Sequence, residues 1–172
     1  MLAFVFSSGC SGRIEPTYQE YDIPRLVKNI CKEEYGLDVV TRRTKTTLWI
    51  YAPLKKILHE EYGVNKDKVF DEGMVEKLRN ILTTTGRVLI SSDDTPQFYA
   101  LVASDTNLGI DYTIIGSVLD IKKSYAQFIP WMEANRRYVV RLRMSPQAIG
   151  DETGFHIQSD DIQLSDFLAE QI

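Results

Sequence analysis

The sequence predicts an α+β fold, with a mainly antiparallel sheet of two hairpins and a further strand, covered by helices. Two observations lead to this prediction. Segments with helical periodicity alternate with segments rich in β-branched and aromatic residues, and the latter come in pairs. The expected order is helix, strand, strand, helix, strand, strand, helix, strand, helix. Hairpins that are separated by helices favour an antiparallel sheet with its helices on one side.

The first helix is expected at Asp22–Tyr35. Asp22 is a candidate N-cap, Pro24 suits the first turn, and Gly36 suits the position after the last turn. Cys31 falls on the apolar side of this helix. We therefore interpret Cys31 as a buried small side chain rather than a reactive thiol.

The first hairpin is expected from the strands Leu37–Arg43 and Thr46–Ala52. In the second strand, Trp49 and Tyr51 alternate with aliphatic residues, so both faces of this strand are expected to be at least partly covered. Pro53 is expected to end the strand, because proline lacks the N–H that a sheet ladder needs.

The middle of the chain is expected to be mostly helical. Leu54–Asn65 is compatible with a short helix, and Val69–Ile90 places apolar residues at helical spacing. Gly86 weakens the end of this longer helix, so a strand at Arg87–Ser91 is the alternative.

The second half of the chain repeats the pattern. Phe98–Ser104 and Ile110–Gly116 are expected to form the second hairpin, and Val118–Phe128 the next helix. Arg136–Met144 alternates apolar and basic residues, which is typical of a half-buried strand. A last helix is expected from Asp160 onward and lacks a C-cap, so we expect it to be cut short.

Three arginines near the last strand form the best candidate surface for a partner. Arg137, Arg141 and Arg143 are predicted on one strand face, and Trp131 lies upstream of them. Such a face can bind phosphate groups or an acidic partner. The alternative is a solvated face paired with Asp and Glu of a neighbouring element. Because the chain carries a net charge of -4, no nucleic-acid partner is expected.

No arrangement of residues indicates catalysis, a metal or a cofactor, and we expect none of the three. His59 lies in HEEYG rather than in HExxH, and His156 has only scattered carboxylates near it in the sequence. Asp93, Asp94 and Asp105 flank a predicted strand, where Asp commonly caps loops and turns. The alternative role of these three carboxylates is acid–base or cation-dependent hydrolysis.

The chain opens with MLAFVFSSGCSG, an apolar stretch followed by small residues and Cys10, and residues 11–21 are polar. This arrangement resembles the end of a bacterial lipoprotein signal peptide, which is cleaved before a cysteine that carries the lipid. The resemblance implies a membrane anchor at Cys10. Ser11 implies the outer membrane where enterobacterial sorting applies. On this interpretation 1–21 is a signal-peptide remnant and polar tether, and 22–172 is a single domain.

Leu2–Phe6 is too short to span a membrane. It is alternatively an edge strand of an intracellular domain, or part of a disordered terminus. Taken together, the sequence predicts a non-catalytic, lipid-anchored cell-envelope protein that binds or assembles with another envelope protein. The alternative is an intracellular small-ligand-binding or regulatory domain.

Overall fold

The computed structural model describes residues 22–59, 70–93 and 95–144. The predictions for Cys10, Asp94, His156 and the helix from Asp160 lie outside these residues. The helices are α1 (Ile23–Tyr35), α2 (Glu72–Ile90), α3 (Val118–Tyr125) and α4 (Trp131–Arg136). The strands are β1 (Val40–Thr44), β2 (Thr47–Leu54), β3 (Phe98–Asp105), β4 (Ile110–Ser117) and β5 (Val139–Met144).

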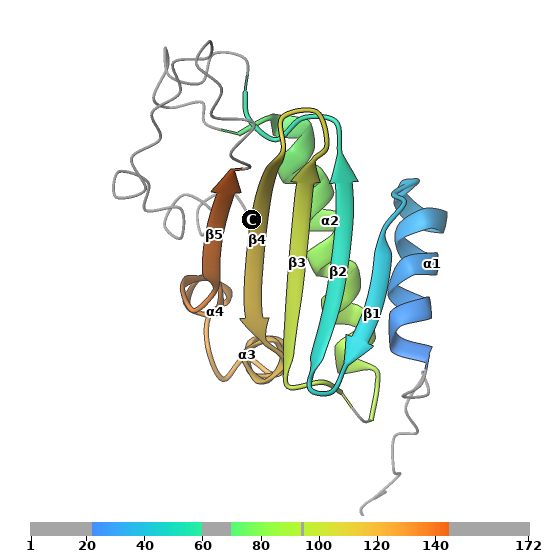
Figure 1. Cartoon of the computed structure of the whole chain (residues 1–172). Helices are drawn as coiled ribbons and strands as arrows, with labels where there is room; N and C mark the ends of the chain where they lie inside the picture. Colours follow the sequence, from blue (N-terminus) through green and yellow to red (C-terminus); the bar gives the residue numbers. More distant parts are fainter. Residues whose placement is uncertain (1–21, 60–69, 94, 145–172) are drawn as a thin grey trace, which may run out of the picture.

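The five strands form one sheet in the order β1-β2-β3-β4-β5 (Figure 1). Neighbouring strands are antiparallel except β2 and β3, which run parallel. The parallel pair arises because α2 carries the chain back to the end of the sheet where β2 began. The predicted α+β class with a mainly antiparallel sheet is thus confirmed, and the two hairpins lie side by side within one sheet.

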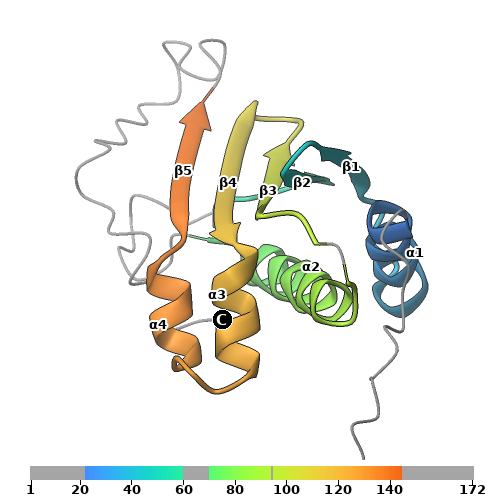
Figure 2. The same cartoon turned by 90° about the horizontal axis from the view of Figure 1, so that it is seen from below.

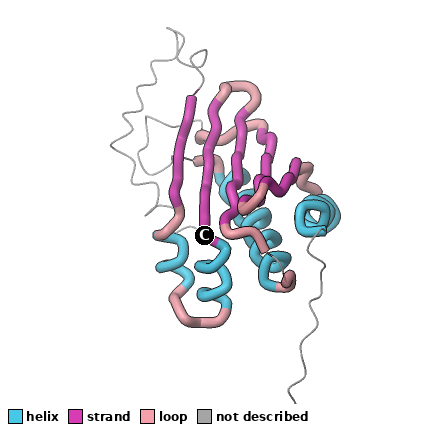
Figure 3. Tube along the Cα trace, turned by 60° about the horizontal axis from the view of Figure 1, so that its bottom comes forward, coloured by secondary structure: helices cyan, strands magenta, loops and turns pink. Residues whose placement is uncertain are grey.

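The described helices lie on one side of the sheet, as the view from below shows (Figure 2). α2 lies behind the central strands in Figure 1, and α1 packs against α2 and β1. α3 and α4 form a helical hairpin at the end of the sheet where β4 stops and β5 starts (Figure 3). None of the described helices is long and apolar enough to cross a lipid bilayer.

The core fills the space between the sheet and these helices. Alternate residues of each strand point to the same face, so one face of the sheet can be apolar throughout. Large side chains that are almost fully buried come from the strands and from α2: Leu48, Ile50, Tyr99, Leu101, Tyr112, Ile114, Met74, Leu78, Ile81 and Leu89. Burial of this apolar surface is the main stabilising contribution to the fold.

α1 matches its predicted bounds. Pro24 lies in the first turn, and Gly36 ends the helix with φ 65°, a left-handed conformation that glycine adopts without strain. Cys31 is fully buried on the apolar side, as predicted. At the helix surface, Arg87 of α2 donates to Glu34 of α1 at 2.7 Å, which joins the two helices.

α2 begins at Glu72 rather than Val69 because Asp71 caps it. The Asp71 Oδ1 accepts a hydrogen bond from the Met74 N–H at 3.1 Å. The helix continues through Gly86 to Ile90, so the alternative strand at 87–91 is wrong. Gly86 packs beside Tyr125 of α3, and a Cβ there would lie at an ordinary van der Waals distance, 3.4 Å, from the Tyr125 hydroxyl oxygen.

Other boundaries also differ from the prediction. β2 continues through Pro53 to Leu54. β1 starts only at Val40, opposite Tyr51, rather than at Leu37. At Pro53, β2 therefore has a neighbouring strand on one side only, and the missing N–H is tolerated. The expected helix after Leu54 is absent from its described part, where Leu58 forms an isolated bridge.

β5 starts at Val139 instead of Arg136 because the preceding residues, Trp131–Arg136, form the short helix α4. Arg137 is the C-cap of that helix. The apolar–basic alternation therefore begins before the strand does.

Candidate functional site

The sheet has one face covered by helices and one that no described helix covers. In β2 the buried residues alternate with Trp49 and Tyr51, whose exposed fractions are 44% and 39%. The strand register carries this alternation across the sheet, because residues paired across strands point to the same side. We call the uncovered side the open face. It is formed by Val40, Arg42, Thr44, Thr47, Trp49, Tyr51, Pro53, Phe98, Ala100, Val102, Ser104, Asp111, Thr113, Ile115, Ser117, Val139, Arg141 and Arg143.

Apolar side chains occupy much of the open face. The exposed ones are Val40, Trp49, Tyr51, Phe98 and Val139, whereas Ala100 between them is buried. One row across the strands reads Arg42, Trp49, Ala100, Ile115 and Val139. The next row reads Val40, Tyr51, Val102, Thr113 and Arg141. Phe98 lies toward the helical hairpin, and it is exposed like the two aromatic side chains of β2. Because strands lie about 4.8 Å apart, five strands make a surface roughly 19 Å wide.

Arginines lie on both edge strands of the sheet. Arg42 projects from β1, and Arg141 and Arg143 project from β5 as exposed side chains. Among the residues that form the open face, the one carboxylate belongs to Asp111, which is paired with Arg143 in the strand register. Asp111 also accepts a hydrogen bond from the Ser104 hydroxyl at 2.6 Å. Three guanidinium groups and one carboxylate leave this face with a positive excess on an acidic chain.

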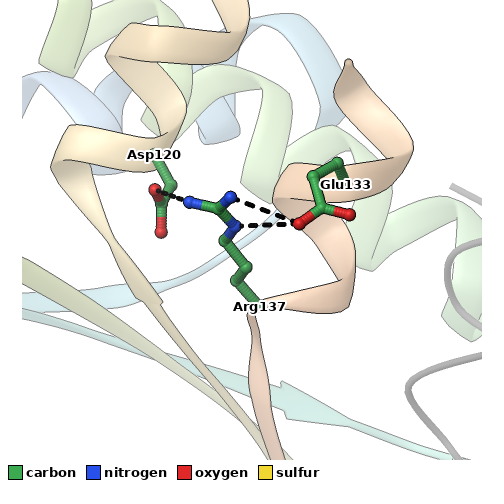
Figure 4. A network of polar contacts seen from close by, with 3 residues as sticks. All are labelled: Asp120, Glu133 and Arg137. Atoms are coloured by element: carbon green, nitrogen blue, oxygen red, sulfur yellow. Dashed lines mark hydrogen bonds and ion pairs between the residues drawn. The ribbon is translucent and has the colours of Figure 1, made fainter. Parts of the chain in front are cut away.

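Arg137 lies apart from Arg141 and Arg143. Its guanidinium donates to Asp120 of α3 at 3.1 Å and to Glu133 of α4 at 3.2 Å (Figure 4). Hydrogen bonding to Glu133, together with the charge of Asp120, raises the pKa of Arg137 further. Arg137 therefore links the two helices of the hairpin, and the predicted three-arginine face contains only its two members in β5.

Trp131 also belongs to the helical hairpin. It is the first residue of α4, and its ring packs edge-on against Tyr125 with centroids 6.0 Å apart. A shallow groove of about 490 Å³ runs beside the two rings, and Gln127, Ile129 and Pro130 contribute to its lining. The hairpin is at one end of the sheet, whereas Arg143 is near the other end of β5 (Figure 1). Trp131 and Arg143 thus lie in different surfaces.

Of the carboxylates considered for hydrolysis, Asp105 is held by hydrogen bonds within the fold and Asp93 is exposed. Asp105 is buried, and its Oδ1 accepts hydrogen bonds from the N–H groups of Asn107 and Leu108 at 2.9 and 3.0 Å. Its Oδ2 accepts from the Ile57 N–H at 3.3 Å, so the side chain joins the β3–β4 turn to the segment after β2. Within the described ranges, no three His, Cys, Asp or Glu side chains are grouped to hold a metal.

Cys31 has the properties of a core residue. Burial raises the pKa of its thiol to about 11, so the thiol is protonated at neutral pH and is a poor nucleophile. Burial likewise raises the pKa of Tyr112 on the covered face. These two groups reflect the packing of the core rather than a reactive centre.

The aromatic part of the open face was missed as a site in the sequence, although its signal was present. TLWIYAPL alternates aliphatic with aromatic residues, so both faces of β2 are apolar. Sequence alone could not show which of the two faces the helices leave uncovered. The chain matches no protein-family model, no curated protein and no solved structure.

Proposed function

We propose that this chain is a non-catalytic protein-binding module of the bacterial cell envelope, anchored by a lipid on Cys10, whose partner binds the open face. The observation that carries the binding part is the set of exposed apolar side chains on the open face, above all Trp49 and Tyr51, with arginines on both edge strands. The support for the anchor is the opening sequence that ends at Cys10.

The residue types of the open face suit a protein partner. Trp, Tyr and Arg are the residues that most often dominate the energy of protein–protein binding. Burial of exposed apolar surface contributes about 25 cal/mol per Å², and Trp49, Tyr51 and Phe98 offer large rings for it. The surface is wide enough for a helix of roughly 10 Å diameter. The expected partner surface is apolar at its centre and carries carboxylates that meet Arg42, Arg141 and Arg143.

The proposal that the protein is non-catalytic is supported by the hydrogen bonds that the described polar side chains make. Asp105 has hydrogen bonds to three backbone N–H groups and is turned inward, away from any substrate. Asp111 and Ser104 are bonded to each other on the open face, without a described His beside them to activate the hydroxyl.

Charge reversal tests the binding surface. Arg141→Glu with Arg143→Glu is expected to weaken retention of the partner in pull-downs at least tenfold, because two attractive charges become repulsive. The melting temperature is expected to stay nearly unchanged, since both side chains are exposed.

Lys28→Glu with Lys77→Glu is the matched control, because it changes the charge equally on exposed residues of α1 and α2. Equal loss of the partner with both pairs would mean that only net charge matters. A large fall in melting temperature with the arginine pair would make those arginines structural.

Lipid labelling tests the anchor. The gene is expressed with its native upstream region in a bacterial host that is fed labelled palmitate. We expect label in the membrane-associated protein and loss of the label in Cys10→Ala. An unlabelled protein in the cytoplasmic fraction would contradict the anchor and favour the intracellular small-ligand-binding or regulatory alternative.

A further inference from the structure

A second group of exposed apolar side chains lies on the helical hairpin, away from the open face. It consists of Leu119, Tyr125, Phe128, Trp131 and Met132, which we call the hairpin tip. Phe128 is 80% exposed, the highest value among the large apolar side chains of the described residues. So many large apolar groups within one short segment are unusual for a surface that faces only water.

The backbone holds this tip in a defined shape. Gln127 has φ 60°, and the Phe128 N–H donates to the Lys123 carbonyl at 2.8 Å, which closes the turn after α3. Arg137 then links α3 to α4 through Asp120 and Glu133 (Figure 4). Phe128 is thus presented on a fixed turn.

The hairpin also differs in charge from the rest of the chain. Residues 118–137 contain Lys122, Lys123, Arg136 and Arg137 against Asp120 and Glu133, so four positive and two negative groups give +2. The whole chain carries -4. An apolar, aromatic tip with a positive excess matches the interface of an anionic bilayer, where Trp and Tyr gather and Lys side chains reach the headgroups.

The position of the tip fits a membrane contact. α1 begins at Ile23 at the same end of the sheet as α3 and α4 (Figure 1). The 13 residues from Cys10 to Ile23 can extend over roughly 40 Å. A lipid on Cys10 and the hairpin tip can therefore meet one membrane at the same time.

We propose that the hairpin tip is a second membrane contact, in which Phe128, Met132 and Trp131 enter the interfacial layer of an anionic bilayer. The tether part of this placement rests on the proposed function, but the contact itself does not require the lipid.

The test uses the full chain with Cys10→Ala, so that no lipid contributes. The chain has two tryptophans, Trp49 on the open face and Trp131 in the tip. In a Trp49→Phe variant, only Trp131 fluoresces as tryptophan, and its emission is recorded as vesicles are added. The vesicles contain phosphatidylcholine with about 30% phosphatidylglycerol, which gives them a negative surface charge. We expect a blue shift, and quenching by brominated acyl chains. With Trp131→Phe, the remaining Trp49 is expected to change little.

Vesicle co-sedimentation supplies the second readout. Phe128→Asp with Met132→Asp is expected to raise the apparent Kd for these vesicles roughly tenfold or more, because two charges would enter the interface. The matched control, Val40→Asp with Val139→Asp, changes two exposed apolar residues of the open face and is expected to keep vesicle binding.

The proposal would be overturned if the Trp131 emission did not change when vesicles are added. It would also be overturned if the Phe128→Asp/Met132→Asp variant bound vesicles as well as the Val40→Asp/Val139→Asp control. Vesicle binding that depends on Val40 and Val139 instead would assign the lipid contact to the open face and contradict the proposed function as well. Loss of the protein partner through Phe128 and Met132, without vesicle binding, would make the tip a protein-binding surface and also overturn the proposal.

Discussion

Gly116 and Tyr99 show how closely single residues are fitted on the covered face of the sheet. They are paired between β3 and β4, and a Cβ at position 116 would overlap the Tyr99 ring. Gly116→Ala is expected to lower the free energy of unfolding by about 1–3 kcal/mol, because a packed core resists added volume. Chemical denaturation measures this loss.

The second substitution Tyr99→Leu provides the control. If the overlap is the cause, Tyr99→Leu with Gly116→Ala loses less stability than the sum of the single changes. Simple additivity, or a Gly116→Ala variant as stable as the wild type, would contradict the close approach.

Arg137 is a single residue whose position the sequence pattern did not predict. The alternation of basic and apolar residues runs from Arg137 to Arg143, and it predicts one continuous face. In the structure a helix ends at Arg136, so Arg137 lies before β5 and bonds to Asp120, a residue 17 positions away. The periodicity of one segment cannot predict a contact with a residue of another element, here Asp120 of α3.

At the scale of elements, α2 is the crossover on which the sheet depends. Asp71 caps its first turn through the Met74 N–H. Asp71→Ala is expected to lower the free energy of unfolding by about 1 kcal/mol, whereas Asp71→Asn keeps an accepting oxygen and is expected to lose much less. Thermal or urea unfolding of the two variants checks this difference. Equal losses would mean that the charge of Asp71, rather than its cap, matters.

The existence of most elements could be predicted from the sequence, but how they are joined could not. The hairpins β1–β2 and β3–β4 follow from local turns and alternation. The parallel pairing of β2 with β3 depends on the path of α2 and on contacts between distant residues such as Ile50 and Leu101. Gly86 resembled a break because glycine disfavours the helical conformation, yet α2 continues through it among buried neighbours.

In the whole molecule, three regions lie apart from one another. Helices on one side bury the core, the other side of the sheet is the open face, and the helical hairpin carries an apolar tip at one end (Figure 2). In the proposed arrangement, the lipid on Cys10 and the hairpin tip would hold the protein at a membrane, and the open face would bind the partner. A partner bound there would meet Trp49 and Tyr51 at its centre and arginines at both edges.

The most direct measurement of this account is site-specific photo-crosslinking in the native host. A photoreactive residue is placed at position 49 or 139 on the open face, and at exposed Lys77 of α2 as the control. We expect one partner to crosslink from positions 49 and 139, to be lost with Arg141→Glu and Arg143→Glu, and to be absent from position 77. Crosslinks to the same partner from position 77 with equal yield, or none from positions 49 and 139, would contradict the proposal that the open face binds the partner.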